Sequence, residues 1–159
     1  TVCIKTMADT SLNENRLALL IWQTSNLWQS KVRQKLKESE ITLNEYLILE
    51  TIYLLQQQKI NITQKDICIN ASIDRSVVSL RVSSLEEKKL ISKQQPQDKR
   101  SDSLILSEAG NNLINNIFDN IVELENELFN KLGSEIFNFT NSLKLLLGKK
   151  IRIRAKLND

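Results

Sequence analysis

Glycine and proline are scarce in this chain of 159 residues, which contains three glycines and one proline. Proteins built only from strands need these residues at the tight turns between their many short strands. Long stretches of the sequence instead place apolar residues at steps of three and four, the spacing that gives a helix one apolar face. We therefore predict a mainly α-helical protein that is long enough to bury a core without disulfides or metals.

The residue types that most catalytic and metal sites use are absent or scattered. The chain has no histidine, and its two cysteines, Cys3 and Cys68, are far apart in the sequence. Catalytic triads that need histidine are therefore excluded, and four zinc ligands are not expected. We predict no catalytic residues, no metal and no cofactor, in a protein that is not an enzyme. Because no apolar run is long enough for a membrane span and no segment has the order of a signal peptide, we also predict a cytoplasmic protein without membrane contact.

The apolar spacing and the capping residues predict six helices and one pair of strands. Thr42 with Glu45 has the pattern of a capping box, and Thr63, Asp74 and Ser107 are further predicted caps. Two short helices joined by residues 70–73 and followed directly by two strands are typical of a winged helix-turn-helix. The predicted helices span residues 13–37, 42–58, 64–69, 75–88, 108–132 and 134–148, and the predicted strands span 90–93 and 103–106.

The charges of the chain are distributed unevenly. Residues 63–106 sum to +2 and residues 148–159 to +4, whereas residues 107–147 sum to −4, within a total of +3. The basic segments are compatible with a polyanionic partner such as nucleic acid. Many basic proteins bind no nucleic acid, so the charge alone does not identify the partner.

The predicted hairpin and the residues after it carry a known sequence pattern. Residues Asp98 to Gly110 match D-x-R, five residues, L-[TS]-x-x-G at every fixed position. In this pattern the chain resembles the MarR (multiple antibiotic resistance regulator) family of winged-helix transcription factors, whose order of elements it also shares over residues 13–147. Residues 74–79 and 85–91 are similar to the start and the end of the recognition helix in that family.

The resemblance implies a fold, a function and a division of the chain. The implied fold is a winged helix-turn-helix with long N- and C-terminal dimerisation helices, and the implied function is a transcriptional regulator, expected to be a repressor. Such a protein binds a pseudo-palindromic operator in double-stranded DNA as a homodimer. Residues 13–40 and 107–148 would be the dimerisation region and residues 41–106 the DNA-binding domain, with a flexible N-terminus at 1–12 and a loose basic tail at 149–159.

The candidate DNA-binding side chains come from the recognition helix and from the wing. Helical spacing places five of them on the face opposite Val78, Val82 and Leu85. In the resemblance, one wing arginine enters the minor groove, a lysine contacts phosphate and an aspartate supports the wing. These candidates are Arg75, Ser76, Ser79, Leu80 and Ser83 on the helix, and Arg100, Lys99 and Asp98 in the wing.

Three positions of the recognition helix depart from the family pattern. Family members often have a basic residue where Leu80 stands and an apolar residue where Arg81 stands, so the order is exchanged here. Ser84 occupies another position that is commonly basic. Leu80 is then a candidate for contact with a thymine methyl group, and Arg81 for contact with phosphate or with an acidic neighbour.

Several alternatives stay open from the sequence. The acidic helical stretch after the wing is compatible with a dimeric protein-interaction module that has little or no specific DNA binding. A small aromatic ligand or an oxidant is a candidate signal that releases the DNA. Cys3 and Cys68 are candidate redox residues, although apolar neighbours predict a buried, inert Cys68. Four aromatic residues either line a ligand cleft or belong to the core, namely Trp22, Trp28, Tyr46 and Tyr53.

Overall fold

A computed structural model describes residues 15–95 and 102–153 of the chain. It divides into two compact units, residues 1–122 and residues 123–159.

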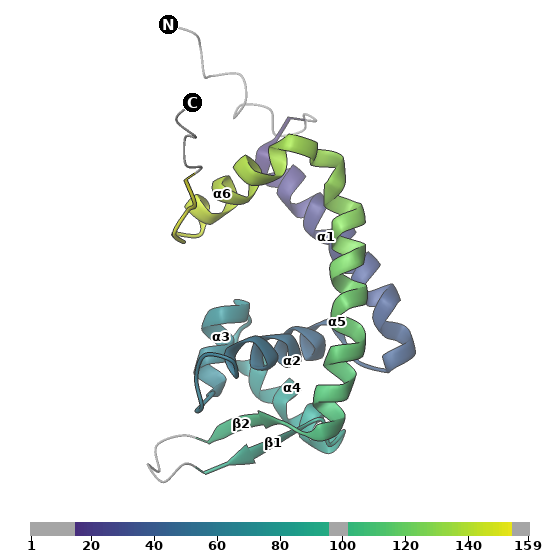
Figure 1. Ribbon diagram of the computed structural model, residues 1–159, viewed down its shortest axis with the longest axis vertical. Coiled ribbons are helices and arrows are strands. Elements are labelled where there is room, and N and C mark those ends of the chain that lie inside the picture. Colours follow the sequence, from purple (N-terminus) through teal and green to yellow (C-terminus); the bar gives the residue numbers. More distant parts are fainter. Residues whose placement is uncertain (1–14, 96–101, 154–159) are drawn as a thin grey trace, which may run out of the picture. The chain divides into compact units, whose positions relative to one another are not determined.

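The first unit consists of helices followed by a two-stranded hairpin and the start of a long helix. Its lobe formed by α2, α3, α4 and the hairpin is shown in Figure 1. This order of elements confirms the predicted winged helix-turn-helix in a mainly α-helical chain. The elements are α1 (Leu17–Leu36), the 3-10 turn η2 (Lys37–Ser39), α2 (Leu43–Leu55), α3 (Gln64–Ala71), α4 (Arg75–Glu87), β1 (Ile91–Gln94), β2 (Ser103–Leu106) and α5 (Glu108–Phe129).

The core of the first unit lies where α2 packs against α3, α4 and β2. Apolar side chains from every one of these elements are excluded from solvent, and α1 and α5 add their own buried residues. Burial of these side chains is the main favourable contribution to folding of the lobe. The fully buried positions include Val32, Leu36, Ile48, Leu49, Ile52, Ile67, Val78, Val82, Leu85, Leu104, Ile114 and Ile121.

Capping boxes begin α2 and α3; the sequence predicts the one at Thr42 and, at Thr63, a cap without its reciprocal partner Asp66. The Thr42 hydroxyl accepts from the Glu45 amide at 3.2 Å, and the Glu45 carboxylate accepts from the Thr42 amide at 3.1 Å. Thr63 and Asp66 make the same reciprocal pair at the start of α3. These bonds satisfy amides that have no partner inside the helix.

Two predicted helix starts need correction. Helix α1 begins at Leu17 rather than near residue 13, because Arg16 has an extended backbone and its side chain does not cap the helix. Asp74 occupies the N-cap position of α4, but its side chain accepts no capping hydrogen bond. Helix α4 therefore begins without the side-chain cap that the sequence predicts.

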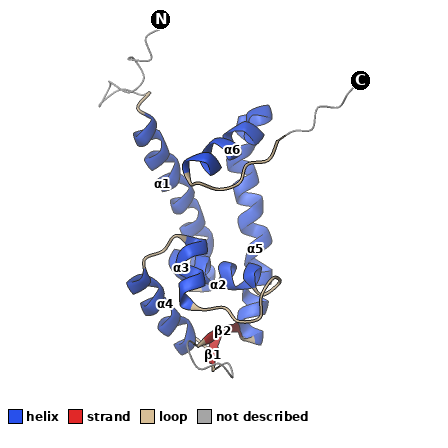
Figure 2. Ribbon diagram, turned by 90° about the vertical axis from the view of Figure 1, so that its left-hand side faces the viewer, coloured by secondary structure: helices blue, strands red, loops and turns tan. Residues whose placement is uncertain are grey.

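The hairpin is short and antiparallel, with Ile91 opposite Leu106 and Gln94 opposite Ser103. Figure 2 shows these strands as the only strands among the described residues, beside an otherwise helical chain. On the other edge of β2, the Leu104 amide donates to the Ile62 carbonyl at 2.7 Å. The Ile62 amide donates to the Ser103 hydroxyl at 3.3 Å. The segment before α3 thus holds the hairpin onto the helices.

The second unit contains the end of α5, the 3-10 segment η3 (Asn130–Glu135) and α6 (Ile136–Leu146). Gly148 ends α6 with a φ of 66°, while its amide and that of Lys149 bond back to the last turn, which is a Schellman motif. The Asn141 side chain then accepts from the Arg152 amide at 3.1 Å and donates to the Arg152 carbonyl at 2.7 Å. The first residues of the predicted loose tail are therefore attached to α6.

No helix within residues 15–95 and 102–153 combines the length and the apolar character that a membrane span needs.

Candidate nucleic-acid interface

Helix α4 separates an apolar side from a polar side. Val78, Val82 and Leu85 have no exposed surface and face the core. All five candidate side chains of this helix are exposed, as the periodicity predicts, namely Arg75, Ser76, Ser79, Leu80 and Ser83. Such an exposed face, with three serines, one arginine and one leucine on a fixed helix, has the form that enters a DNA major groove.

A turn with a left-handed residue joins α3 to α4. Ser72 adopts a φ of 52°, a conformation that is unfavourable for residues other than glycine, asparagine and aspartate. It ends α3 and lets the chain reverse so that α4 packs against both α3 and α2. The chain therefore makes the helix-turn-helix bend without a glycine.

The end of α4 is attached to the base of the wing. Lys89 has a φ of 58°, and the Leu90 amide bonds to the Leu85 carbonyl at 3.0 Å, which completes a Schellman motif. The Ser107 amide donates to the Leu90 carbonyl at 3.0 Å, and the Ser107 hydroxyl donates to the Lys89 carbonyl at 2.7 Å. These bonds connect α4, β1 and the start of α5 through a few backbone atoms.

Gly110 allows this junction to form. A Cβ atom at this position would lie 2.0 Å from the Leu90 carbonyl oxygen, far closer than Cβ atoms come to such an oxygen in folded proteins. The Gly110 amide donates to the Ser107 hydroxyl at 3.0 Å, so Ser107 both caps α5 and bridges to α4. The serine and glycine of the sequence signature thus hold the base of the wing onto the end of the recognition helix.

A buried carboxylate fixes the C-terminal half of α4 against α2. Glu45 is 1% exposed, and its carboxylate accepts from the Ser84 hydroxyl at 2.8 Å and from the Lys88 ammonium at 3.1 Å. The Lys88 ammonium also donates to the Glu40 carbonyl at 2.8 Å. Ser84 therefore turns towards α2, and this part of α4 is engaged inside the lobe.

These hydrogen bonds decide the charge state of Glu45. Burial raises the pKa of its carboxyl, but the bonds from Ser84, the Thr42 amide and Lys88, with the Lys88 charge, outweigh burial. The pKa of Glu45 consequently lies below its ordinary value. At neutral pH the network holds a carboxylate and an ammonium as an ion pair.

A cavity of about 600 Å³ lies beside the start of α4. Its lining combines the first turn of α3 with the first residue of α4 and the residue before β2. Gln64 and Lys65 are not among the candidates from the sequence, although the cap at Thr63 is a signal that places them at a helix N-terminus. The lining residues are Thr63, Gln64, Lys65, Cys68, Arg75 and Asp102.

Asp66 holds the start of α3 in place beside this cavity. It accepts from the Lys59 ammonium at 2.8 Å, in addition to the bonds of the Thr63 capping box. Burial raises the pKa of Asp66, but the Lys59 and Thr63 bonds outweigh it and lower the pKa below its ordinary value.

Cys68 departs from its predicted environment. The sequence predicts a buried thiol, whereas the structure leaves Cys68 partly exposed on the wall of the cavity of about 600 Å³. The prediction from the apolar neighbours is wrong because only one of them, Ile67, is buried in the core, whereas Ile69 is 66% exposed. The other candidate redox residue, Cys3, lies outside the described residues.

Arg81 does not pair with an acidic neighbour among the described residues. Its Nε atom is enclosed by protein and has no hydrogen-bond partner there. The predicted wing residues Asp98, Lys99 and Arg100 lie outside the described residues. At the base of the wing, Lys93 pairs with Glu86 of α4 at 3.1 Å.

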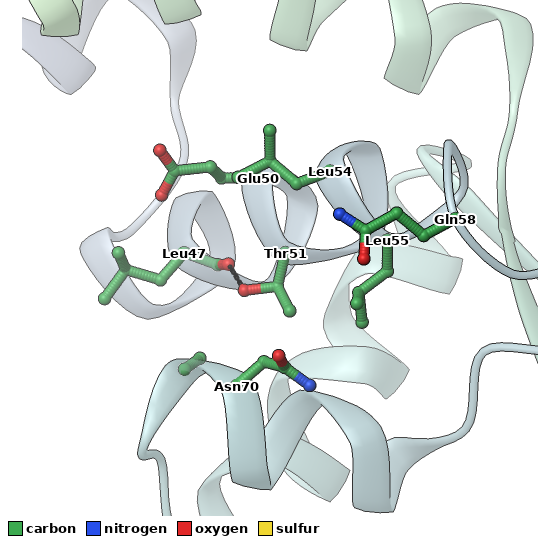
Figure 3. Close-up of a pocket in the computed structure, with 8 residues that line it drawn as sticks. Leu47, Glu50, Thr51, Leu54, Leu55, Gln58 and Asn70 are labelled. Atoms are coloured by element: carbon green, nitrogen blue, oxygen red, sulfur yellow. Dashed lines mark hydrogen bonds between the residues drawn. The ribbon is translucent and has the colours of Figure 1, made fainter. Parts of the chain in front are cut away.

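A second cavity of about 450 Å³ lies between α2 and α3 and has an aliphatic and polar lining. Figure 3 shows Thr51 on this wall, where its hydroxyl donates to the Leu47 carbonyl at 2.6 Å. The four candidate aromatic residues are absent from its lining. Tyr46 is buried in the core, Tyr53 packs on Phe118 with ring centroids 5.8 Å apart, and Trp22 is 64% exposed.

The sequence of the chain is similar to a known protein family and to a known protein. The model of the MarR family matches residues 41–101, which include α2, α3, α4 and β1. An uncharacterized HTH-type transcriptional regulator of Bacillus subtilis strain 168, YdcH, is 30% identical over 129 residues, which cover 80% of this chain and 87% of that protein.

Solved structures of a regulator from S. aureus are also similar. The MepR chain in a MepR–DNA complex matches with a TM-score of 0.77 and 26% identity, over 86% of this chain and 97% of MepR. MepR in its DNA-binding conformation matches with a TM-score of 0.73 and 28% identity, over 82% of this chain and 96% of MepR.

Proposed function

Because this chain belongs to the MarR family of transcriptional regulators, we propose that it represses transcription as a homodimer bound to a pseudo-palindromic DNA operator. The observation that carries the proposal is the exposed polar face of α4, held in place on its other side by the core. A rigid helix is what base recognition needs, because side chains on a mobile segment do not hold their positions against base edges.

The proposed contacts divide into base recognition and phosphate binding. Arg75, Ser76, Ser79, Leu80 and Ser83 meet base edges or the adjacent backbone in the major groove. Lys65, which shares a cavity with Arg75 at the start of α3, contacts phosphate beside the groove. The chemistry of the signature supports minor-groove entry by Arg100, phosphate contact by Lys99 and support of the wing by Asp98.

The proposed dimer uses the helices outside the DNA-binding lobe. In α1, Leu17 is 63% and Trp22 64% exposed, and in α6 Leu146 is 70% exposed. A second copy of the chain would remove this apolar surface from water, which favours association. Residues 41–106 then form the DNA-binding domain, and the dimerisation region is at 13–40 and 107–148.

Release of the DNA by a small ligand is the proposed regulation. The cavity between α2 and α3 supports it, because about 450 Å³ falls within the range of small-molecule sites. An aliphatic wall with Glu50, Thr51 and Gln58 offers both apolar and polar contacts.

A titration tests the proposed function. The purified protein is added to a fluorescent duplex of the intergenic DNA upstream of its own gene, and to a scrambled duplex, at several salt concentrations. We expect a preference of ~10³ or more for the native sequence, with two chains per site and a linear fall of log affinity with log salt. Equal binding of the two duplexes at every salt concentration would refute sequence-specific recognition of this DNA, and absence of binding at low salt would favour a protein-interaction module.

A further inference from the structure

The recognition helix exposes an apolar side chain where a DNA-binding face is expected to be polar. Among the thirteen residues of α4, Leu80 is the one large apolar side chain that is exposed, at 62%. One helical turn before and after it stand Ser76 and Ser83, which offer no apolar surface to cover it. Transfer of such a leucine side chain from water into contact with an apolar partner is favourable.

We propose that Leu80 packs against the 5-methyl group of a thymine, so that each operator half-site has a thymine opposite the middle of α4. This inference rests on the proposed function, because it assigns part of the DNA sequence that the same helix recognises. It makes Leu80 a specificity-determining residue.

The charges of α4 indicate which half of the helix enters the groove. Arg75 lies at its start, whereas Glu86 and Glu87 lie in its last turn and would be repelled by phosphate. Ser84 and Lys88 at that end are bonded to Glu45 inside the lobe. The first two turns are therefore free to approach DNA, and Leu80 stands at the end of that stretch.

The shape of the exposed face favours contact by Leu80. Its neighbours Ser76, Ser79 and Ser83 have short side chains, and the Ser83 hydroxyl donates to the Ser79 carbonyl at 3.2 Å. Leucine extends beyond such hydroxyls and is the side chain that reaches furthest into the groove from the middle of α4. It has no donor or acceptor with which to bind a polar base edge.

The chemistry of the major groove then selects the base. Thymine presents a methyl group there beside its O4 acceptor, whereas guanine, cytosine and adenine present hydrogen-bonding atoms and no methyl group. An apolar side chain against those atoms would remove them from water without a replacement partner, which is unfavourable. A protein partner is disfavoured because a single leucine among serines is far smaller than an apolar docking patch.

The test uses the full-length protein and a duplex selected by it from a random library. Each thymine of the selected half-site is replaced in turn by deoxyuridine, which removes one methyl group and leaves base pairing unchanged. We expect one symmetric pair of positions at which the replacement weakens binding about fourfold per half-site, and about fifteenfold for both, the value of one buried methyl group.

Two variants connect that position to Leu80. Leu80→Ala should bind the thymine and deoxyuridine duplexes equally at that position, while it keeps its sensitivity elsewhere. The matched control Ser83→Ala, on the next turn of the same face, should keep the thymine preference whatever its overall affinity.

The outcomes separate this inference from the proposed function. If a site is selected but no deoxyuridine position weakens binding, or if Leu80→Ala keeps the full thymine preference, the role of Leu80 is refuted and DNA recognition stands. If the wild-type protein selects no sequence, both are refuted.

Discussion

At the scale of single residues, Gly110 leaves no room for a side chain. Its missing side chain lets the first turn of α5 lie against the Leu90 carbonyl, with 2.0 Å between that oxygen and the place of a Cβ atom. The Ser107 hydroxyl completes the same junction. The glycine of the signature is therefore required by packing between two pieces of backbone, and the proposed DNA contacts of the wing depend on it indirectly.

Gly110→Ala should lower the free energy of unfolding by about 2 kcal/mol or more, although alanine is the better helix former. The control Asn112→Ala, at an exposed position of the same helix, should change it by less than about 0.5 kcal/mol. Urea denaturation at equal protein concentration measures both. A Gly110→Ala protein as stable as the wild type would contradict the close approach at this junction.

Lys89 has a left-handed backbone conformation, which is unfavourable for a residue with a side chain. With a φ of 58° it occupies the position where helices commonly end on glycine. Lys89→Gly should raise the free energy of unfolding by about 1 kcal/mol, while Lys89→Ala should leave it nearly unchanged. Thermal denaturation of the two variants distinguishes the outcomes, and a stabilised Lys89→Ala would show that the lysine charge, rather than its backbone, limits stability.

Periodicity predicts which side chains of α4 are buried, because the side of the helix on which a residue lies follows from helical geometry alone. It places Val78, Val82 and Leu85 inside and the five candidate contacts outside, as the structure has them. It fails for Cys68, which its apolar neighbours predict to be buried, because the surroundings of Cys68 include residues of other elements that meet it only in the folded chain.

At the scale of elements, the recognition helix is positioned by a carboxylate at the start of another helix. Glu45 caps α2 and also bonds to Ser84 and Lys88 near the end of α4. The capping box is readable in the sequence, since its two residues are three apart. The two bonds to α4 join residues 39 and 43 positions apart, so no local pattern indicates them.

The Glu45 network makes stability depend on pH. Its pKa is lower in the folded chain than its ordinary value of 4.5, so the ionised form stabilises the fold above that value. This contribution is lost as the pH falls through the folded pKa. Glu45→Gln should therefore be about 2 kcal/mol less stable than the wild type at pH 7, because it removes the charge that Lys88 pairs with.

The difference between wild type and Glu45→Gln should shrink at acid pH. Urea denaturation at pH 7, pH 5 and pH 3.5 measures it for both proteins. A difference that is absent at pH 7, or that grows as the pH falls, would show that Glu45 is not held as a stabilising carboxylate.

At the scale of the whole molecule, each unit leaves apolar surface without a partner in the described chain. Leu17 and Trp22 of α1 belong to the first unit, and Leu145 and Leu146 of α6 to the second. The amphipathic pattern predicts these helices, but a pattern does not show whether an apolar side faces the same chain or another copy. The winged helix is predictable because its signature has fixed spacing, whereas the dimer stays a proposal.

Leu146→Glu should weaken the proposed dimer at least about 100-fold, because it places a charge in a surface that a second copy would bury. Sedimentation velocity over a range of concentrations measures the change, with Asn61→Glu at an exposed position outside the proposed dimerisation helices as the control. Wild type and control should sediment as dimers and Leu146→Glu as a monomer. A Leu146→Glu dimer of unchanged affinity would exclude this part of α6 from the interface.

If the exposed face of α4 reads DNA sequence, substitutions on it should lower the affinity for the operator more than the affinity for unrelated DNA. Arg75, on the first turn of α4, is proposed to contact bases directly, and a bidentate arginine contact distinguishes bases by a factor of about ten to one hundred. Loss of such a contact should affect the operator and spare unrelated DNA. A surface lysine away from this face, Lys31 on α1, serves as the matched charge control.

The most direct test is therefore the operator affinity of Arg75→Ala, measured by fluorescence anisotropy against the operator and a scrambled duplex at one salt concentration. We predict at least a tenfold loss on the operator, little change on the scrambled duplex, and wild-type behaviour for Lys31→Ala. Equal losses on the two duplexes, or no loss on the operator, would contradict recognition of DNA sequence by Arg75 and the face of α4 to which it belongs.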